Sequence, residues 1–375
     1  MRQGPIAGLR VLEFASIGPG PFAGMLLSDL GADVVRVDRP GEPRGLSSAV
    51  TDRGRRSVPL DLKREPDREV CLALIERAEV LIEGYRAGVM ERLGLGPELA
   101  LKRNSRLVYG RVTGYGQSGP LARSAGHDIN YIALSGALHA IGTAERPILP
   151  LNLLGDFAGG ALYLAFGLLA AVVHARATGQ GQVVDAAMSD GAASLMAAIY
   201  GLHSAGRWSN VRADNLLDGA APYYDVYQCA DGRWLAVGAL EARFYETLIR
   251  SLGLQIEDLP DRDDRSRWPE LRARIAVQIR TRTRAQWCEA LAGADACVAP
   301  VLGLDEAPLH AHNRARGTFA DVDGVTQPAP QPRFSETPGA IQTPKLQPSR
   351  AWQATLEDWG VSAGLIAGLR GDPAQ

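Results

Sequence analysis

The chain has little lysine and almost no net charge, and each shortage bears on the class of protein. Of its 40 basic residues only three are lysine (Lys63, Lys102 and Lys345), so arginine carries nearly all the positive charge. We attribute this preference to codon bias, because abundant arginine does not by itself identify an anion-binding protein. The formal net charge of −2 lacks the positive surplus that nucleic-acid-coating proteins and polybasic membrane binders need.

Cysteine is scarce as well. The four cysteines form no C-x-x-C pair and have no histidine at zinc-finger spacing: Cys71, Cys229, Cys288 and Cys297. Isolated thiols in a chain of 375 residues are typical of a reducing compartment. The first residues lead into a strand-like segment at Leu9 without the apolar run of a signal peptide. We therefore expect a cytoplasmic protein that holds no metal.

Only one long hydrophobic run is present. Residues 157–173 carry no charge, and their number is at the lower edge of what a membrane-spanning helix needs. Gly159, Gly160 and Gly167 interrupt the run. A helix that is apolar all round is also typical of a protein core, so we expect a buried helix and no membrane partner.

The remaining composition, 46% apolar and 22% charged, is that of a globular protein, and the length allows roughly two domains. In the first third of the chain, short β-rich runs alternate with helical ones. Strands are expected at residues 10–14, 33–37, 58–62, 80–82 and 107–112, and helices at residues 22–30 and 66–77. This alternation predicts an α/β fold with a parallel, doubly wound, Rossmann-like sheet.

The pattern turns helical after residue 128 and changes again after residue 205. The first of these regions predicts helices at residues 129–140, 157–178 and 188–204, with a returning strand at 183–185. In the second, an Asp231-Gly232 turn predicts a hairpin of residues 224–228 and 233–237. Helices are expected after the hairpin at residues 242–252, 268–281 and 285–291.

These patterns predict three parts of the chain. We expect residues 1–205 to form a large Rossmann-like domain, residues 206–315 a smaller α+β domain, and residues 316–375 a linker and C-terminal segment that returns to the large domain. Within the last part, residues 324–350 are rich in proline and are expected to wrap as a linker, and residues 352–369 are weakly helical.

The first strand-to-helix turn imitates a nicotinamide-binding motif. Gly18, Gly20 and Gly24 lie in this turn, and Asp38 follows Gly18 by 20 residues, as an acidic ribose ligand would. The motif needs free backbone N–H groups that point at a pyrophosphate, but prolines at positions 19 and 21 remove two of them. We therefore interpret the segment as a tight structural turn.

Three titratable positions are candidates for acid/base chemistry. His127 lies in a loop that leads into an expected helix, with Asp128 at the position of an N-cap. Asp156 immediately precedes the apolar helix, where N-capping explains it equally well. Glu241 opens another helix, where the helix dipole is an ordinary explanation. Spacing alone does not assemble these residues into one site.

Several segments taken together resemble the class III CoA-transferase superfamily. They are residues 8–15, 18–21, 29–37, 61–63, 83–86, 88, 113–120 and 179–188. Within that superfamily, residues 126–131 (Gly-His-Asp-Ile-Asn-Tyr) and 221–224 (Ala-Pro-Tyr-Tyr) resemble the α-methylacyl-CoA racemases, especially the bacterial enzymes. The resemblance implies a large Rossmann-like domain with a small domain inserted, and two chains interlocked as rings in a homodimer.

The resemblance also implies roles for individual residues. His127 and Asp156 match the two proton-transfer groups, and Glu241 matches the residue that hydrogen-bonds the histidine. Contacts to CoA and to the acyl group fall on Arg39, Leu60, Asp61, Leu62, Lys63, Gly84, Tyr85, Arg86, Arg92, Gly126, His127, Asp128, Ile129, Asn130 and Tyr131. CoA is part of the substrate, and no further cofactor is implied. Leu60 departs from the pattern, because it is bulkier than the small residue expected beside CoA.

The chemistry agrees with this resemblance. Inverting the carbon beside a thioester carbonyl requires one group to remove its proton and another to return a proton on the opposite face. Backbone N–H groups at the helix start near Asp128 are candidates for stabilising the enolate oxygen. Two alternatives remain open: a CoA-transferase in which Asp156 is a nucleophile that forms an acyl-aspartyl anhydride, and a non-catalytic acyl-CoA-binding protein.

Overall fold

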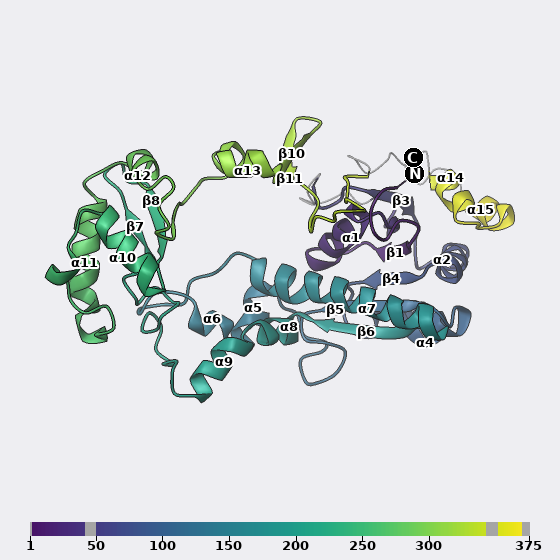
Figure 1. The fold of residues 1–375 in the computed structure, drawn as a ribbon. Helices are drawn as coiled ribbons and strands as arrows, with labels where there is room; N and C mark the ends of the chain where they lie inside the picture. The colour runs from purple at the N-terminus through teal and green to yellow at the C-terminus, as the bar shows by residue number, and fades with distance from the viewer. Residues whose placement is uncertain (1, 42–49, 343–351, 370–375) are drawn as a thin grey trace. The chain divides into compact units, whose positions relative to one another are not determined.

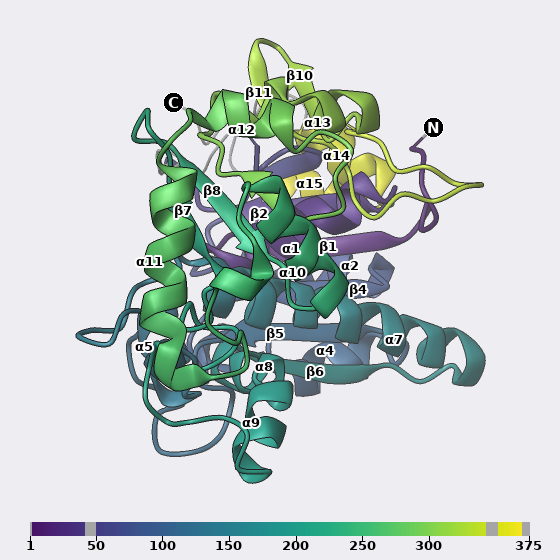
Figure 2. The same ribbon diagram turned by 60° about the vertical axis from the view of Figure 1, so that its left-hand side comes forward.

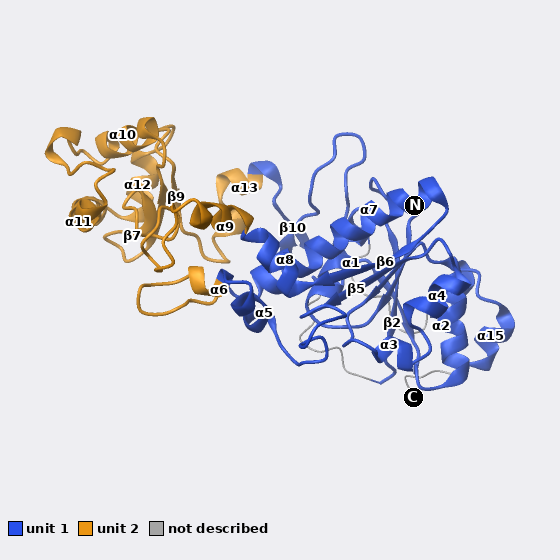
Figure 3. Cartoon of the chain, turned by 90° about the horizontal axis from the view of Figure 1, so that it is seen from below, with its two compact units in different colours: residues 1–137, 150–196, 315–375 blue, residues 138–149, 197–314 orange. Residues whose placement is uncertain are grey.

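The computed structural model describes residues 2–41, 50–342 and 352–369, and the chain divides into two compact units (Figure 3). Unit 1 comprises residues 1–137, 150–196 and 315–375, and unit 2 comprises residues 138–149 and 197–314. The domain boundaries predicted at residues 205 and 315 lie near the ends of the longer piece of unit 2. Residues 138–149, which we expected in the large domain, group with unit 2.

Unit 1 is built on a six-stranded sheet in which every neighbouring pair is parallel (Figure 1). The strands are β1 (Arg10–Phe14), β2 (Asp33–Asp38), β3 (Arg55–Pro59), β4 (Val80–Glu83), β5 (Val108–Thr113) and β6 (Gln182–Ala187). Their order is β3-β2-β1-β4-β5-β6, which is the order of doubly wound dinucleotide-binding folds. The predicted α/β fold with a parallel sheet is confirmed, although β3 begins three residues earlier than expected.

Helices cover both faces of this sheet. On one face, α1 (Pro19–Asp29) and α7 (Tyr163–Thr178) share a buried core with apolar residues of the strands such as Val11 and Val34. The core of the other face combines strand residues such as Leu12 and Leu81 with α2 (Glu65–Arg77), α4 (Pro97–Arg103) and α14 (Trp352–Asp358), and α15 (Ala363–Gly368) contacts α2. The C-terminal segment therefore belongs to the core of unit 1, as predicted.

The long helix predicted at residues 157–178 differs from its expected form. It begins earlier, with a π-helical segment η1 (Leu153–Leu162) that continues into α7. By length and composition this stretch could cross a membrane, but a core helix of a soluble protein passes the same test. We expected burial all round; instead Leu164 and Leu168 are buried, whereas Leu162, Phe166 and Val173 are 50%, 74% and 70% exposed.

Several shorter elements connect the sheet to the rest of the chain. The helix predicted at residues 129–140 is divided into α5 (Asp128–Leu134) and α6 (Ala137–Ala140), and the one at 188–204 into α8 (Met188–Leu195) and α9 (Ala197–Ser204). A further short helix, α3 (Val89–Arg92), follows β4. Within the proline-rich segment, β11 (Val325–Pro328) pairs with β10 (Phe319–Val322), and residues 343–350 lie outside the described residues.

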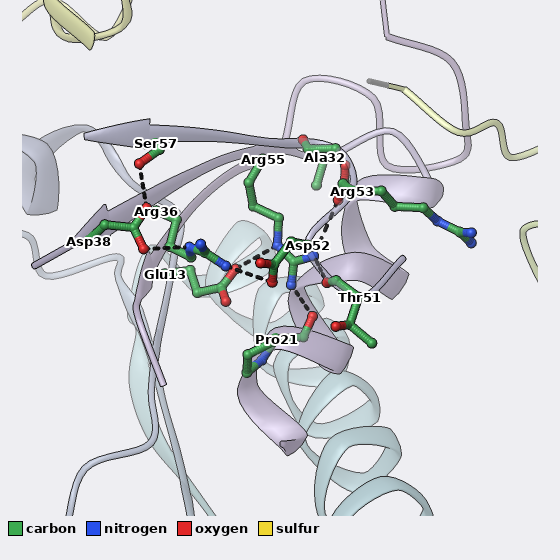
Figure 4. Close-up of polar contacts among 12 residues, drawn as sticks. Glu13, Pro21, Ala32, Arg36, Asp38, Thr51, Asp52, Arg53, Arg55 and Ser57 are labelled. Carbon is green, nitrogen blue, oxygen red and sulfur yellow. Dashed lines mark hydrogen bonds and ion pairs between the residues drawn. The ribbon is translucent and has the colours of Figure 1, made fainter. Parts of the chain in front are cut away.

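Buried charges join β1, β2 and β3. We call Glu13, Arg36, Asp52, Arg53 and Arg55 the arginine cluster (Figure 4). Arg55 Nε lies 2.9 Å from Glu13 Oε2, and Arg36 Nη1 lies 2.8 Å from Asp52 Oδ1. Arg55 also donates to the carbonyl oxygen of Pro21 in the first turn of α1. Arg53 pairs with Asp29 at the end of α1 and donates to Gln327 of β11 at 2.7 Å. The cluster therefore ties α1 and β11 to the sheet.

Unit 2 has the smaller α+β form that was expected. The predicted hairpin is present as β7 (Tyr224–Gln228) and β8 (Trp234–Gly238), and β9 (Val298–Pro300) completes an antiparallel sheet. Figure 2 shows α11 (Trp268–Ile279) beside β7, which it contacts, with α10 (Ala242–Ser251) and α12 (Arg284–Ala290) in the same unit. The core of unit 2 contains Tyr227, Leu235, Leu248, Ile275 and Trp287.

Candidate active site

The predicted ligand contacts of unit 1 follow the carboxyl ends of its strands. Arg39 comes directly after β2, residues 60–63 follow β3, and residues 84–86 follow β4. Because parallel strands end at one edge of a sheet, the fold gathers these segments there. The strand order reverses between β1 and β4, and open α/β sheets bind ligands outside the carboxyl ends at such a point.

The structure explains why a bulky Leu60 is tolerated in this edge. Its side chain is 1% exposed and belongs to the core on the α2 side of the sheet. Its backbone N–H donates to the carbonyl oxygen of Asp38 at 2.9 Å. The Leu60 side chain is therefore a core residue, and only its backbone is available for the predicted contact.

A buried ion network supports the loop that carries Arg86. Glu83, at the end of β4, accepts a hydrogen bond from the Tyr85 N–H at 2.7 Å. The same carboxylate pairs with Arg111 at 2.7 Å, and Arg111 reaches Glu91 on α3 at 2.8 Å. Because α3 also carries Arg92, this network holds the segments of two predicted CoA contacts, Arg86 and Arg92, to β5.

His127 and Asp128 lie at the start of α5, where the N-cap residue differs from the predicted one. His127 is the N-cap residue, and the Asn130 side chain accepts a hydrogen bond from its N–H at 3.0 Å. Asp128 is the first helical residue, so its predicted N-cap role was wrong. Its carboxylate instead accepts hydrogen bonds from the N–H groups of Gly155 and Asp156, at 2.6 and 2.7 Å.

Asp156 lies within the first turns of η1, whose N-cap is Asn152, so N-capping does not explain the aspartate. The Asn152 side-chain amide donates to Asp156 Oδ2 at 3.3 Å across one turn. Gly18 lies close as well, because a Cβ atom placed on it would be 3.2 Å from Asp156 Oδ2. The predicted tight turn before α1, where Gly18 has a φ of 71°, therefore brings the start of that helix to the carboxylate.

The surroundings of Asp156 favour its protonated form. Burial raises the pKa of its carboxyl above the ordinary value, and the negative charge of Asp128 raises it further. The Asn152 hydrogen bond and the His127 imidazole act in the opposite direction. Within the part of the chain that the structure describes, neither Asp128 nor Asp156 forms an ion pair with an arginine or a lysine. A carboxylate in this environment is a stronger base than an exposed one.

Tyr131 closes the loop that holds His127. Its hydroxyl donates to the Gly126 carbonyl oxygen, and its ring packs edge-on against Tyr115, with centroids 5.0 Å apart. Burial and the neighbouring Asp156 carboxylate raise the pKa of Tyr131 to about 12. Tyr131 therefore stays a neutral hydrogen-bond donor that fixes residues 126–131.

Glu241 lies in unit 2, as the N-cap residue of α10, and its side chain is exposed. Its charge affects the pKa of Cys297, so the two side chains are near one another. Cys297 lines a cleft of ≈ 630 Å³ together with residues of β7, β8 and β9. The hydrogen bond between Glu241 and His127 that the resemblance implies stays a prediction.

Other expectations concern cofactors. Asp38, which is spaced in the sequence as an acidic ribose ligand would be, pairs with Arg36 at 3.0 Å and accepts a hydrogen bond from Ser57. Among the described residues, no group of three or more histidine, cysteine, aspartate or glutamate side chains could hold a metal ion.

The sequence analysis missed two residues that contact the predicted site, Asn152 and Gly155. The spacing of four residues between Asn152 and Asp156, one helical turn, could have indicated the first.

Comparisons with known proteins identify the family and the fold of this chain. The family model described as CoA-transferase family III matches residues 6–350. An alpha-methylacyl-CoA racemase of Mus musculus is 44% identical over 98% of this chain and 96% of its own length. A succinyl-CoA:mesaconate CoA-transferase of Haloarcula hispanica is 32% identical over 95% and 94%. The crystal structure of a CAIB/BAIF family protein from Brucella suis superposes with a TM-score of 0.83 at 23% identity, covering 96% of this chain and 100% of that one.

Proposed function

The chain belongs to CoA-transferase family III, and from that premise we propose that it racemises 2-methylacyl-CoA thioesters. Identity of 44% to a curated racemase, against 32% to a curated transferase, supports this choice. The observation that carries it is the half-buried Asp156, whose pKa is raised and whose neighbour in the fold is His127. An imidazole and a carboxyl group are the two kinds of group that a two-base inversion needs.

The reaction proceeds in two proton transfers. In one direction, His127 removes the α-proton, and the electrons of the C–H bond move to the thioester oxygen, which gives an enolate. Asp156, in its acid form, then donates a proton to the opposite face of the carbon. In the other direction the roles reverse. The first N–H groups of α5, which have no partner within a helix, stabilise the enolate oxygen.

CoA is held at the carboxyl edge of the sheet in this proposal. Arg39, Arg86 and Arg92 contact its phosphates, and residues 60–63, 84–85 and 126–131 contact the remainder of the substrate. The exposed guanidinium of Arg86, on a loop fixed by Glu83 and Arg111, supports the phosphate assignment. Glu241 orients the imidazole of His127, as a carboxylate orients the histidine of other acid/base sites.

The test of this proposal uses both catalytic groups. In deuterated water, either enantiomer of a 2-methylacyl-CoA thioester should yield product that carries deuterium at the α-carbon. His127→Ala and Asp156→Ala should each lower racemisation by at least about 10², the low end for a general acid or base. A transferase that uses Asp156 as its nucleophile predicts a different result: Asp156→Ala inactive, His127→Ala nearly normal, and CoA transferred to an added free acid. That result would refute the racemase assignment.

We also propose that two chains associate as a homodimer. Leu162, Phe166 and Val173 lie on one face of η1 and α7 and are at least half exposed, and an apolar face of this kind is typical of an interface. A second copy is the occupant that the resemblance implies. Sedimentation velocity should give a dimer at micromolar concentration, and Phe166→Asp should shift it toward the monomer. A wild-type protein that sediments as an active monomer would contradict this proposal.

A further inference from the structure

Asp128 connects two segments that are far apart in the sequence. The residue is 5% exposed, and its Oδ2 accepts both the Gly155 N–H and the Asp156 N–H, at 2.6 and 2.7 Å. The donors are 27 and 28 residues further along the chain. Because His127 immediately precedes Asp128, this one side chain lies between the backbones of the two predicted proton-transfer groups.

The contact supplies what the start of η1 needs. The first N–H groups of a helical segment have no acceptor within it and require one from elsewhere. The N-cap residue Asn152 does not supply it, because no hydrogen bond from the helix reaches its side chain and its amide instead donates to Asp156. Asp128 therefore serves as the cap of η1 from another part of the fold.

The absence of a side chain at Gly155 makes the same contact possible. A Cβ atom at this position would lie 2.7 Å from Asp128 Oδ2 and 2.9 Å from its Cγ, which is closer than side chains approach. Only glycine lets the carboxylate reach the backbone here. Both ends of the contact are thus specified by the sequence, by an acidic residue on α5 and a glycine on η1.

We propose that Asp128 is a positioning residue, whose carboxylate sets the separation of His127 and Asp156 on the two sides of the substrate α-carbon. The proposal rests on the racemase function proposed above. Its physical basis is that short hydrogen bonds to a buried carboxylate hold the backbone of Asp156 to the start of α5. A displacement of about 1 Å in such a pair can cost about 10² in rate.

Two variants separate position from charge. Asp128→Asn keeps the side-chain length and one acceptor oxygen, and its amide group takes the place of Oδ1, which has no hydrogen-bond partner within the described residues. Asp128→Glu keeps the charge but lengthens the side chain by one methylene group. Gly155→Ala provides an independent approach, because its methyl group displaces the carboxylate from the other side.

The measurement is the ratio of α-hydrogen exchange to inversion for each enantiomer in deuterated water. In a displaced pair, each base still exchanges the proton on its own face, but the second group no longer returns a proton on the other face. We expect Asp128→Glu and Gly155→Ala to lower inversion by about 10², with exchange of at least one enantiomer falling less than about tenfold. Asp128→Asn, which keeps an acceptor oxygen at the same distance, should change this ratio less than Asp128→Glu does.

A control and two opposing outcomes complete the test. Asp29→Asn removes a buried carboxylate at the opposite end of α1, where Asp29 pairs with Arg53, and should lower thermal stability without changing the ratio. An unchanged ratio in both Asp128→Glu and Gly155→Ala, or an Asp128→Asn variant as impaired as Asp128→Glu, would overturn the positioning role while wild-type racemisation stands. A wild-type protein that catalyses neither α-hydrogen exchange nor inversion would overturn the proposed function, and the positioning role with it.

Discussion

The arginine cluster and the pair formed by Asp128 and Asp156 are two groups of buried or half-buried charges in the same unit. The partners of their carboxylates are opposite in kind. In the arginine cluster, carboxylates face guanidinium groups: Glu13 pairs with Arg55, and Asp52 with Arg36. At the site, Asp156 faces a second carboxylate, and its hydrogen-bond donor is the neutral amide of Asn152. Paired charges hold elements together, whereas like charges leave a group ready to take up a proton.

The surroundings of α1 illustrate the difference within one element. Arg55 donates to the carbonyl oxygen of Pro21 and so fixes the first turn of α1 to the sheet. The same end of the helix approaches Asp156 through Gly18. Prolines at positions 19 and 21 provide no N–H groups there, so the helix start adds few hydrogen bonds to the carboxylate. The fixed framework and the basic carboxylate thus meet at one helix end.

The largest effect is expected from breaking the arginine cluster. Arg55→Met removes the ion-pair partner of Glu13, which is fully buried, and leaves only the charge of Arg36 to act on it. Removing one partner of a buried ion pair costs about 3 to 5 kcal/mol, so the free energy of unfolding in urea should fall by that amount. The double variant Glu13→Leu with Arg55→Met should recover much of the loss. A single variant as stable as the wild type would show that the pair does not support the sheet.

Arg86 offers the contrast of an arginine without such partners. Its side chain is exposed, and the described residues form no ion pair with it. If it binds a CoA phosphate, Arg86→Ala should weaken binding of CoA and acyl-CoA alike by roughly 1.5 to 3 kcal/mol, and less at high salt. Calorimetry with free CoA measures this loss. Arg103→Ala, which removes an exposed arginine paired with Glu76 on α2, is the matched control and should bind normally.

The sequence was sufficient for the fold where local patterns decide it. Alternating β-rich and helical runs led to the sheet, and the Asp231-Gly232 turn led to the hairpin of unit 2, because short-range periodicity and turn residues determine these elements. The burial of α7 was harder to predict, because an apolar sequence does not show which face the core takes. Leu162 and Phe166 are as apolar as Leu164 and Leu168, yet only the latter two are buried.

The candidate site could be assembled from the sequence only through the resemblance. His127 and Asp156 are 29 positions apart, and nothing in their spacing shows that Asp128 joins them. The misplaced N-cap at Asp128 has a physical cause: acidic residues are favoured both at N-caps and in the first helical turn, so the residue type does not distinguish the two. The acceptor role toward Gly155 and Asp156 depends on tertiary contact.

A smaller effect is expected from giving Asp156 a cation, as in the arginine cluster. Asn152→Lys places an ammonium group where a neutral amide now donates. The groups that face Asp156 are His127 and Asp128 from α5, Tyr131, and Gly18 before α1, so the lysine would be its nearest permanent cation. An opposite charge at this distance lowers a carboxyl pKa by about 1 to 3. In the direction in which Asp156 is proposed to remove the proton, the acidic limb of the pH–rate profile should move to lower pH.

The matched variant Asn152→Leu reverses the sign. It removes a hydrogen bond that favours the charged carboxylate, so the pKa of Asp156 should rise and the same limb should move to higher pH. Initial rates from each enantiomer across pH measure both shifts. Shifts of the same sign in both variants would contradict the account of the Asp156 environment.

The smallest effect concerns stability. The folded-state pKa of Asp156 is raised, so the folded protein holds this proton more tightly than the unfolded chain does. Stability from this group is therefore present at low pH and is lost as the pH rises through the folded-state pKa, and at neutral pH the ionised carboxylate destabilises the fold.

The variant Asp156→Asn keeps the shape of the side chain without its charge. Its melting temperature at pH 7.5 should exceed that of the wild type by a small margin. The difference should disappear below about pH 4, near the ordinary pKa of an aspartate, because the wild-type carboxyl is then protonated as well. Asp190→Asn, at an exposed position in α8, should show no such gain. An Asp156→Asn variant that melts at or below the wild-type temperature at pH 7.5 would mean that Asp156 is stabilised like a carboxylate of the arginine cluster.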